Sequence, residues 1–239
     1  GVEVVQGGTG VLYGPGQIGA TANFLLRTGT DVPSGDVGVT YGSEGMGRVD
    51  GFVGFPVAKN WYGSVGCFYR SSDGIRDTQY KSDEGGQLTA TLKHIGERSS
   101  LLLWGRVLSD KNMFLKQVPI IQGPDGDFHA YPGFDPLTGI YNGRAIQYSD
   151  VPSATGGTQS ANLADGRGAN MRFLGADFNT TLGDWTLSDH VIYSNGHLPT
   201  AALFPGSNPQ PLSAYIYGCN VPQPAGYCTA DNKPVDSHT

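Results

Sequence analysis

The sequence is poor in charged residues and in the residue types that catalytic and metal sites use most. Only 15% of its 239 residues are Asp, Glu, Lys or Arg, whereas a typical soluble protein has about 25%. Cysteine occurs three times and histidine five times, and the histidines are scattered. The sequence contains no HExxH motif, no Cys/His spacing typical of a metal site and no nucleophile–base set. We therefore predict no metal, no cofactor and no catalytic residue, and we expect a protein that is not an enzyme.

Positive charge and long apolar runs are also scarce. The net charge is −6 and the isoelectric point is about 5.2, which argues against a nucleic-acid partner because such proteins carry a basic surface. The chain has no run of eighteen apolar residues, so it contains no transmembrane helix. A membrane-spanning β-strand needs only about 9–11 residues of alternating character, so a membrane protein is not excluded.

Glycine and aromatic residues are abundant, with 37 Gly, 12 Tyr, 10 Phe and 3 Trp. Aromatic residues favour strands, and glycine favours the turns between them. From residue 35 onward, apolar and polar residues alternate with the period of two that strands require. The alternating or strand-like runs are residues 47–57, 61–70, 87–94, 100–108, 171–182 and 185–193.

The connections between these runs differ in length in a regular way. Tight joints occur near 58–60, 96–99 and 183–184, and they alternate with joints at 43–46, 71–86 and 112–168 and with the segment after 196. In an antiparallel meander, every second connection lies at the same end. Short turns at one end and long loops at the other are typical of outer-membrane β-barrels. We predict an all-β fold, a partial antiparallel transmembrane β-barrel of about seven strands, with one helix candidate at Ala20–Leu26.

The opening glycines offer a competing interpretation. Gly14, Gly16 and Gly19 form G-x-G-x-x-G, and Asp31 and Asp36 follow at roughly the ~20-residue distance of a ribose-binding acid. A soluble nucleotide-dependent oxidoreductase would need alternating strands and helices after residue 34. The period-two pattern predicts strands there, so we expect the match to be coincidental.

Residues 2–29 resemble the end of the plug domain in TonB-dependent outer-membrane receptors. The chain departs from that family's pattern at Gln6, where Arg or Lys is usual, at Gly8 in place of Pro and at Ala20 in place of a second Gly. The matching residues are Val2, Glu3, Val4, Gly7, Gly10, Leu12, Tyr13, Gly14, Gly16, Ile18, Gly19 and Asn23.

The resemblance implies a domain organisation and a function. Residues 1–30 would end the plug, and residues 35–239 would begin a barrel that has about 22 strands in the family, with long extracellular loops at about 112–168 and 197–239. We therefore expect a piece of a longer protein in the outer membrane of a Gram-negative bacterium. The resemblance implies active import of a scarce ligand, energised by the TonB–ExbB–ExbD complex through a more N-terminal region.

The plug motif residues would serve the structure, because glycine allows tight turns and close backbone approach. They are Glu3, Gly7, Leu12, Tyr13, Gly14, Gly16, Gly19 and Asn23. A passive porin-like or structural barrel is the alternative function, and it has no use for residues 1–30.

Candidate ligand contacts lie in the long segment 112–168. Aromatic rings with polar neighbours suit a carbohydrate or an aromatic compound, while ferric siderophores are the ligands that the resemblance implies. Alternatively, these rings pack the loop against itself. The candidate residues are Phe128, Tyr131, Phe134, Tyr141 and Arg144.

Two cysteines flank a loop-like stretch near the end of the sequence. Cys219 and Cys228 enclose a Pro/Gly-containing segment, a spacing that allows a disulfide in an oxidising compartment. Two unpaired thiols are the alternative.

Overall fold

The structure, a computed structural model, describes residues 1–6, 20–114, 118–141, 143–203, 227–228 and 234–235. The chain forms two compact units, one of Gly1–Leu115 with Ile140–Ala202 and one of Lys116–Gly139 with Leu203–Thr239. Helix occurs in the described part only as two short 3-10 turns, η1 (Arg144–Ile146) and η2 (Leu163–Asp165). No helix of the described residues has the length and apolar character needed to span a membrane.

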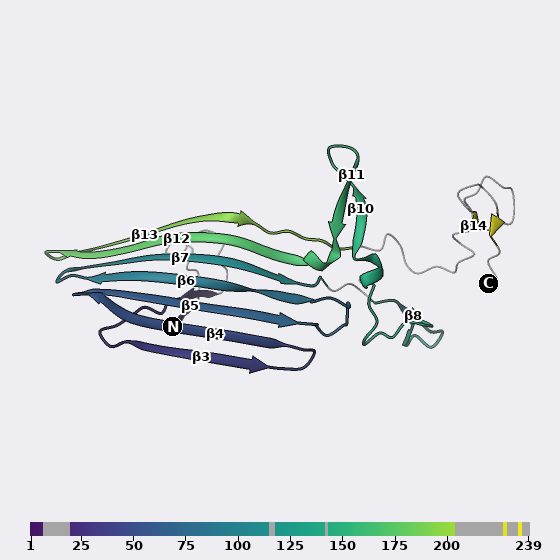
Figure 1. Cartoon of the computed structure of the whole chain (residues 1–239), viewed down its shortest axis with the longest axis horizontal. Coiled ribbons are helices and arrows are strands. Elements are labelled where there is room, and N and C mark those ends of the chain that lie inside the picture. Colours follow the sequence, from purple (N-terminus) through teal and green to yellow (C-terminus); the bar gives the residue numbers. More distant parts are fainter. Residues whose placement is uncertain (7–19, 115–117, 142, 204–226, 229–233, 236–239) are drawn as a thin grey trace. The chain divides into compact units, whose positions relative to one another are not determined.

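Seven long strands of the first unit form one antiparallel sheet (Figure 1). Its spatial order is β13-β12-β7-β6-β5-β4-β3, so strands that are consecutive in this meander pair side by side. Every strand-like run of the sequence lies within one of these strands, and the predicted all-β antiparallel fold is confirmed. The strands are β3 (Ser34–Tyr41), β4 (Gly47–Ala58), β5 (Trp61–Ser72), β6 (Asp83–Ile95), β7 (Ser99–Asn112), β12 (Arg167–Leu182) and β13 (Trp185–His197).

The sheet has two edges and does not close among the described residues. Strands β3 and β13 each pair with one neighbour only. Within the described part of the chain, β3 and β13 therefore each have one side without a neighbouring strand, which is consistent with a partial barrel.

In the described residues, four two-stranded antiparallel pairs lie outside this sheet. Strands β1 (Val2–Gln6) and β2 (Ala20–Phe24) pair at the N-terminus, and β10 (Tyr148–Pro152) pairs with β11 (Thr158–Asn162). In the second unit, β8 (Ile120–Gln122) pairs with β9 (Phe128–Ala130), and β14 (Tyr227–Cys228) with β15 (Pro234–Val235).

The predicted helix at Ala20–Leu26 is wrong. Ala20–Phe24 is strand β2, and its register places Phe24 opposite Val2 and Ala20 opposite Gln6. A helix this short is unstable by itself in water. Pairing with β1 supplies the backbone hydrogen bonds that such a helix would lack.

The strand connections alternate in length as the sequence predicts. Residues 59–60, 96–98 and 183–184 join strands at one end of the sheet, which we call the tight-turn end. Residues 42–46, 73–82 and 113–166 join them at the other end, which we call the loop end. Two 3-10 turns and three strand pairings interrupt the long connections and the segment beyond β13.

The two faces of the sheet differ in chemistry. On one face, here called the apolar face, large apolar side chains point to the surroundings instead of into a core; Val37 is 79% exposed and Leu174 is 63% exposed. The registers place on this face Val37, Val53, Val65, Leu88, Leu103, Val107, Leu174 and Val191.

The opposite face, here called the polar face, carries charged and hydroxyl side chains together with some aromatic rings. The registers place on it Arg48, Asp50, Ser64, Phe68, Arg70, Thr91, Asp110, Asp177 and His190. The exposure of the apolar face is unusual, because a soluble monomer rarely exposes a large contiguous apolar patch.

The turn between β4 and β5 gives a test of the backbone. Asn60 has a φ of 64°, a left-handed conformation that asparagine tolerates and that costs a β-branched residue roughly 1–2 kcal/mol. We expect Asn60→Val to lower the free energy of unfolding of the protein folded in detergent by that amount, which lowers its urea midpoint. Asn60→Gly should leave the midpoint nearly unchanged. Lys59→Val is the matched control, and equal midpoints for the two valine variants would contradict the assigned turn.

Candidate functional site

The segment between β2 and β3 is bound to the polar face through Arg27. The Arg27 guanidinium forms an ion pair with Asp36 and stacks on the Phe52 ring, 3.7 Å from its centroid. The Arg27 carbonyl accepts a hydrogen bond from the Ser64 hydroxyl at 3.1 Å. Because the Arg27–Asp36 pair is half exposed, water screens it and its net contribution is less than about 1 kcal/mol.

A second contact holds the same segment closer to the tight-turn end. The Tyr62 hydroxyl donates to a carboxylate oxygen of Asp31 at 2.7 Å, and the Tyr62 side chain is only 7% exposed. Between these two anchors, a Cβ on Gly29 would lie 2.3 Å from the Gly63 carbonyl oxygen. Only glycine fits there, so the backbone of the segment lies directly against β5.

The polar face is crossed by paired charges towards the loop end. Arg70 of β5 donates to both carboxylate oxygens of Asp110 at 3.1 and 2.9 Å and to the Asn112 side-chain oxygen at 2.8 Å. On the neighbouring strand, Arg48 bonds Asp50 at 3.2 Å. Charge-assisted bidentate pairs of this kind fix side-chain geometry as well as adding energy. They hold charged side chains in fixed positions on this face.

The loop of residues 73–82 is ordered by its own hydrogen bonds. Thr78 is fully buried, and its hydroxyl donates to the Tyr80 carbonyl at 2.7 Å and lies 3.2 Å from the Ser82 hydroxyl. Burial raises the pKa of the Tyr80 phenol above its ordinary value, so this group is neutral at physiological pH. A Lys81–Asp73 ion pair of 2.7 Å completes the loop.

Arg144, one of the predicted ligand contacts, joins the long connection to this loop. Its Nη2 donates to the Gln79 carbonyl at 2.8 Å. Arginine has five N–H donors, so the guanidinium retains capacity for a ligand. Gln79 itself has a φ of 66°, in the left-handed region.

The other predicted ligand contacts divide between the two units. Phe128, in β9, is exposed, and the Phe134 N–H donates to the Tyr131 carbonyl at 3.0 Å in a turn of the same unit. Tyr141 belongs, with Arg144, to the first unit. A single site made from all five residues therefore stays a prediction.

The plug motif is described only at its two ends. Glu3 in β1 pairs opposite Asn23 in β2, whereas Gly7, Leu12, Tyr13, Gly14, Gly16 and Gly19 lie outside the described residues. Cys219 also lies outside them, while Cys228 is in β14, so the Cys219–Cys228 disulfide stays a prediction. Cys67, on the apolar face, is a free and exposed thiol.

The acids expected at a ribose site have other partners. Asp31 accepts from Tyr62, and Asp36 is paired with Arg27. Strands follow the glycine motif where a dinucleotide-binding domain would have helices. The sequence reasoning missed that these two acids anchor the segment, although Tyr62 stands out as an aromatic residue on a polar strand face. Across the described ranges, no three His, Cys, Asp or Glu side chains gather as metal ligands would.

Comparison with known proteins identifies a fold but no family. No protein-family model matches the sequence, and no curated protein gives a significant match. Among solved structures, the chain is similar to P. aeruginosa FpvA in a complex with a heterologous pyoverdine and Fe, with a TM-score of 0.56 and 16% identity. The match covers 83% of this chain and 24% of the FpvA chain, so this chain spans about a quarter of that protein's length. At this identity, the similarity concerns the fold alone.

The Tyr62–Asp31 hydrogen bond gives a test of the anchored segment. Removing a hydrogen bond to a charged group near the surface costs about 1 kcal/mol, so Tyr62→Phe should raise the rate of trypsin cleavage after Arg27 about fivefold. Tyr69→Phe is the matched control, because the Tyr69 hydroxyl bonds Glu84 on the apolar side of the same strand. If both variants were cleaved like the parent protein, the segment would not be held by Tyr62.

Proposed function

We propose that this chain belongs to a TonB-dependent receptor that imports a scarce ligand across the bacterial outer membrane. One observation carries the proposal: the segment that follows the plug-like motif is anchored on the polar face of a sheet whose other face is apolar. The contacts of Arg27, Gly29 and Asp31 with β4 and β5 supply that anchor. A barrel with a plug inside its lumen needs both features.

The chemistry of the two faces supports a membrane location. Outer-membrane barrels alternate apolar residues facing lipid with polar residues facing the lumen, and aromatic residues mark both interfaces. On the apolar face, Trp61 and Trp185 stand at the tight-turn end and Tyr41 and Tyr69 stand towards the loop end. We infer that the tight-turn end faces the periplasm and that the loop end faces the cell exterior.

The proposed mechanism needs no bond chemistry. The ligand binds non-covalently to candidate contact residues of the segment 112–168, and TonB, with ExbB and ExbD, transmits force through a more N-terminal region of the receptor. The segment with Arg27, Gly29 and Asp31 would stay fixed to the wall while the plug before it is remodelled. Gly29 is suited to this role, because its backbone lies against β5 without an intervening side chain.

The ligand class rests on two different supports. FpvA is described in complex with a pyoverdine and Fe, which favours a ferric siderophore. The exposed ring of Phe128 and the guanidinium of Arg144 would also suit a carbohydrate or a flat aromatic compound. A passive porin-like barrel is the second candidate function, and the polar face is the only observation that favours it. A porin-like barrel would give the anchored segment no role.

The membrane location is tested by placing one charge on each face of β13. Val191→Arg puts a charge on the apolar face, where the cost near the bilayer midplane is about 2–4 kcal/mol. Ser194→Arg, three residues away on the polar face, is the matched control and should cost less than about 1 kcal/mol. Urea unfolding from phospholipid vesicles measures both variants, and equal losses would show that neither face is set apart by lipid.

Active transport is tested by uptake in cells with and without functional TonB. We expect the full-length receptor to take up one of a panel of radiolabelled ferric siderophores, oligosaccharides and aromatic acids. Without TonB, the rate of that uptake should fall at least about tenfold. The energy for accumulation comes only through TonB in this proposal. Uptake that continues unchanged without TonB would favour the porin-like alternative.

A further inference from the structure

We propose that the apolar face binds one membrane lipid with an anionic phosphate head group, across β6, β7, β12 and β13. The inference rests on the proposed function only in requiring that this face meets a bilayer. The lipid would place an acyl chain in an apolar groove and its phosphate at Arg172, which borders the groove at its loop-end side.

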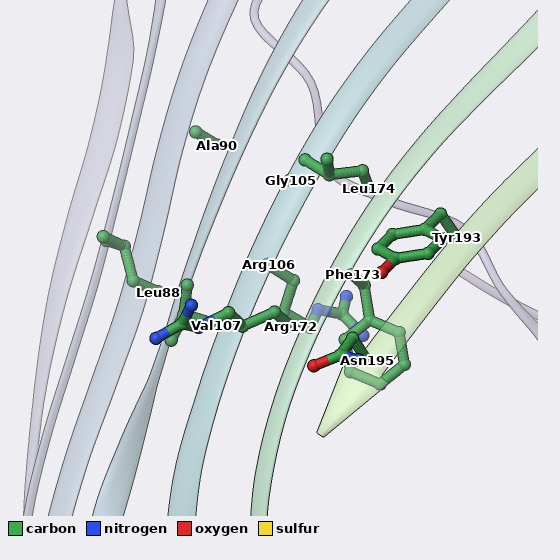
Figure 2. A pocket seen from close by; sticks show the side chains of 10 residues that line it. All are labelled: Leu88, Ala90, Gly105, Arg106, Val107, Arg172, Phe173, Leu174, Tyr193 and Asn195. Atoms are coloured by element: carbon green, nitrogen blue, oxygen red, sulfur yellow. The ribbon is translucent and has the colours of Figure 1, made fainter.

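The groove exists because two small residues interrupt a row of large ones. Gly105 of β7 pairs with Ala90 of β6 and with Leu174 of β12, and Leu174 pairs in turn with Tyr193 of β13. The resulting cavity has a volume of about 450 Å³. Figure 2 shows its lining, with Leu88 on one side and Leu174 and Tyr193 on the other. Its floor is backbone and methyl groups, which suits a hydrocarbon chain.

Arg172 is a charged exception on this face. It lies in the next row towards the loop end, paired between Val107 and Asn195, and its side chain is exposed. Figure 2 shows it extending from β12 across β7 towards Val107. Among the residues that the structure describes, Arg172 has no acidic partner, whereas Arg27, Arg48 and Arg70 each have one.

The row beyond Arg172 is polar. Asn170 pairs between Ser109 and His197, and the Ser109 hydroxyl donates to the Asn170 side-chain oxygen at 2.7 Å. These residues line a second, polar cleft of about 670 Å³. Lys111 in that cleft faces Glu84 at 3.7 Å and donates to the Ala164 carbonyl, so its charge is already matched.

The order of the rows gives the occupant its chemistry. Moving towards the loop end, the face changes from an apolar groove to an unpaired cation and then to a cleft of hydroxyl, amide and imidazole groups. A phospholipid presents hydrocarbon, phosphate and polar head group in that order. An unpaired guanidinium between the apolar groove and the polar cleft complements a phosphate, to which arginine binds with paired N–H donors.

The test uses the full-length receptor purified in dodecyl maltoside, with bound lipid counted by native mass spectrometry. The probes are phosphatidylglycerol and phosphatidylcholine with identical acyl chains, each titrated with and without inorganic phosphate. We expect the parent protein to retain one phosphatidylglycerol in preference to phosphatidylcholine. Arg172→Gln should weaken phosphatidylglycerol binding at least fivefold and abolish the preference.

The groove is tested separately by filling it. A Cβ on Gly105 would lie in van der Waals contact with Leu174, 3.4 Å from its nearest methyl group. Gly105→Leu extends a side chain into the groove and should weaken binding of both lipids. The controls are Lys93→Gln, which removes one positive charge from the polar face away from the groove, and Ala176→Leu, which adds bulk to the apolar face outside the groove. Both controls should bind lipid like the parent protein.

Each result decides the proposal. Unchanged phosphatidylglycerol binding in Arg172→Gln, or in Gly105→Leu, would overturn the proposal. Complete displacement of phosphatidylglycerol by inorganic phosphate would also overturn it, because the acyl chain would then contribute nothing to binding. If Arg172→Gln does not fold, Arg172→Leu, which matches the apolar surroundings, replaces it with the same expectation. Failure of TonB-dependent uptake would overturn the proposed function but not the lipid site, because lipid counting does not depend on transport.

Discussion

The continuous backbone ladder from β3 to β13 is the constraint on which the rest of the structure depends. Only four hydrophobic side chains of the described residues are buried, namely Tyr62, Met113, Leu163 and Ala164, so a packed core cannot hold this sheet together. The ladder pairs both sides of the five inner strands of the sheet, as a chain in a medium without water would require. With the backbone satisfied in this way, the side chains are free to differ completely between the two faces.

The anchored segment contacts only one of those two faces in the described residues. Arg27, Gly29 and Asp31 contact β4 and β5 on the polar face, near the tight-turn end. The N-terminal part of the chain therefore approaches the wall from the side that carries the charges. The buried Tyr62 and the close approach at Gly29 make this contact specific, whereas the exposed ion pair of Arg27 adds little free energy.

Much of the fold was predictable, because successive side chains of a strand point to opposite faces, which gives the sequence a period of two. Residues 87–94 and 171–182 alternate cleanly, and each lies within one strand of the structure. Ala20–Phe24 was not predictable, since its strand exists only through pairing with Val2–Gln6. Long-range contacts such as Arg70–Asp110 were equally hidden, because alternation gives the face of a residue but not its partner. Arg144 was recognised as a candidate contact, but its bond to the Gln79 carbonyl depends on how two loops fold together.

The connection of residues 113–166 divides the assembly of the sheet into two stages. Strands β3 to β7 are joined by short or moderate connections, and β12 and β13 form a hairpin around residues 183–184. Pairing β7 with β12 requires closing the long connection, which costs roughly 3 kcal/mol more chain entropy than closing a two-residue turn. The entropic cost of closing the long connection therefore falls on the pairing of the β12–β13 hairpin with β7, and not on pairing within the meander or within the hairpin.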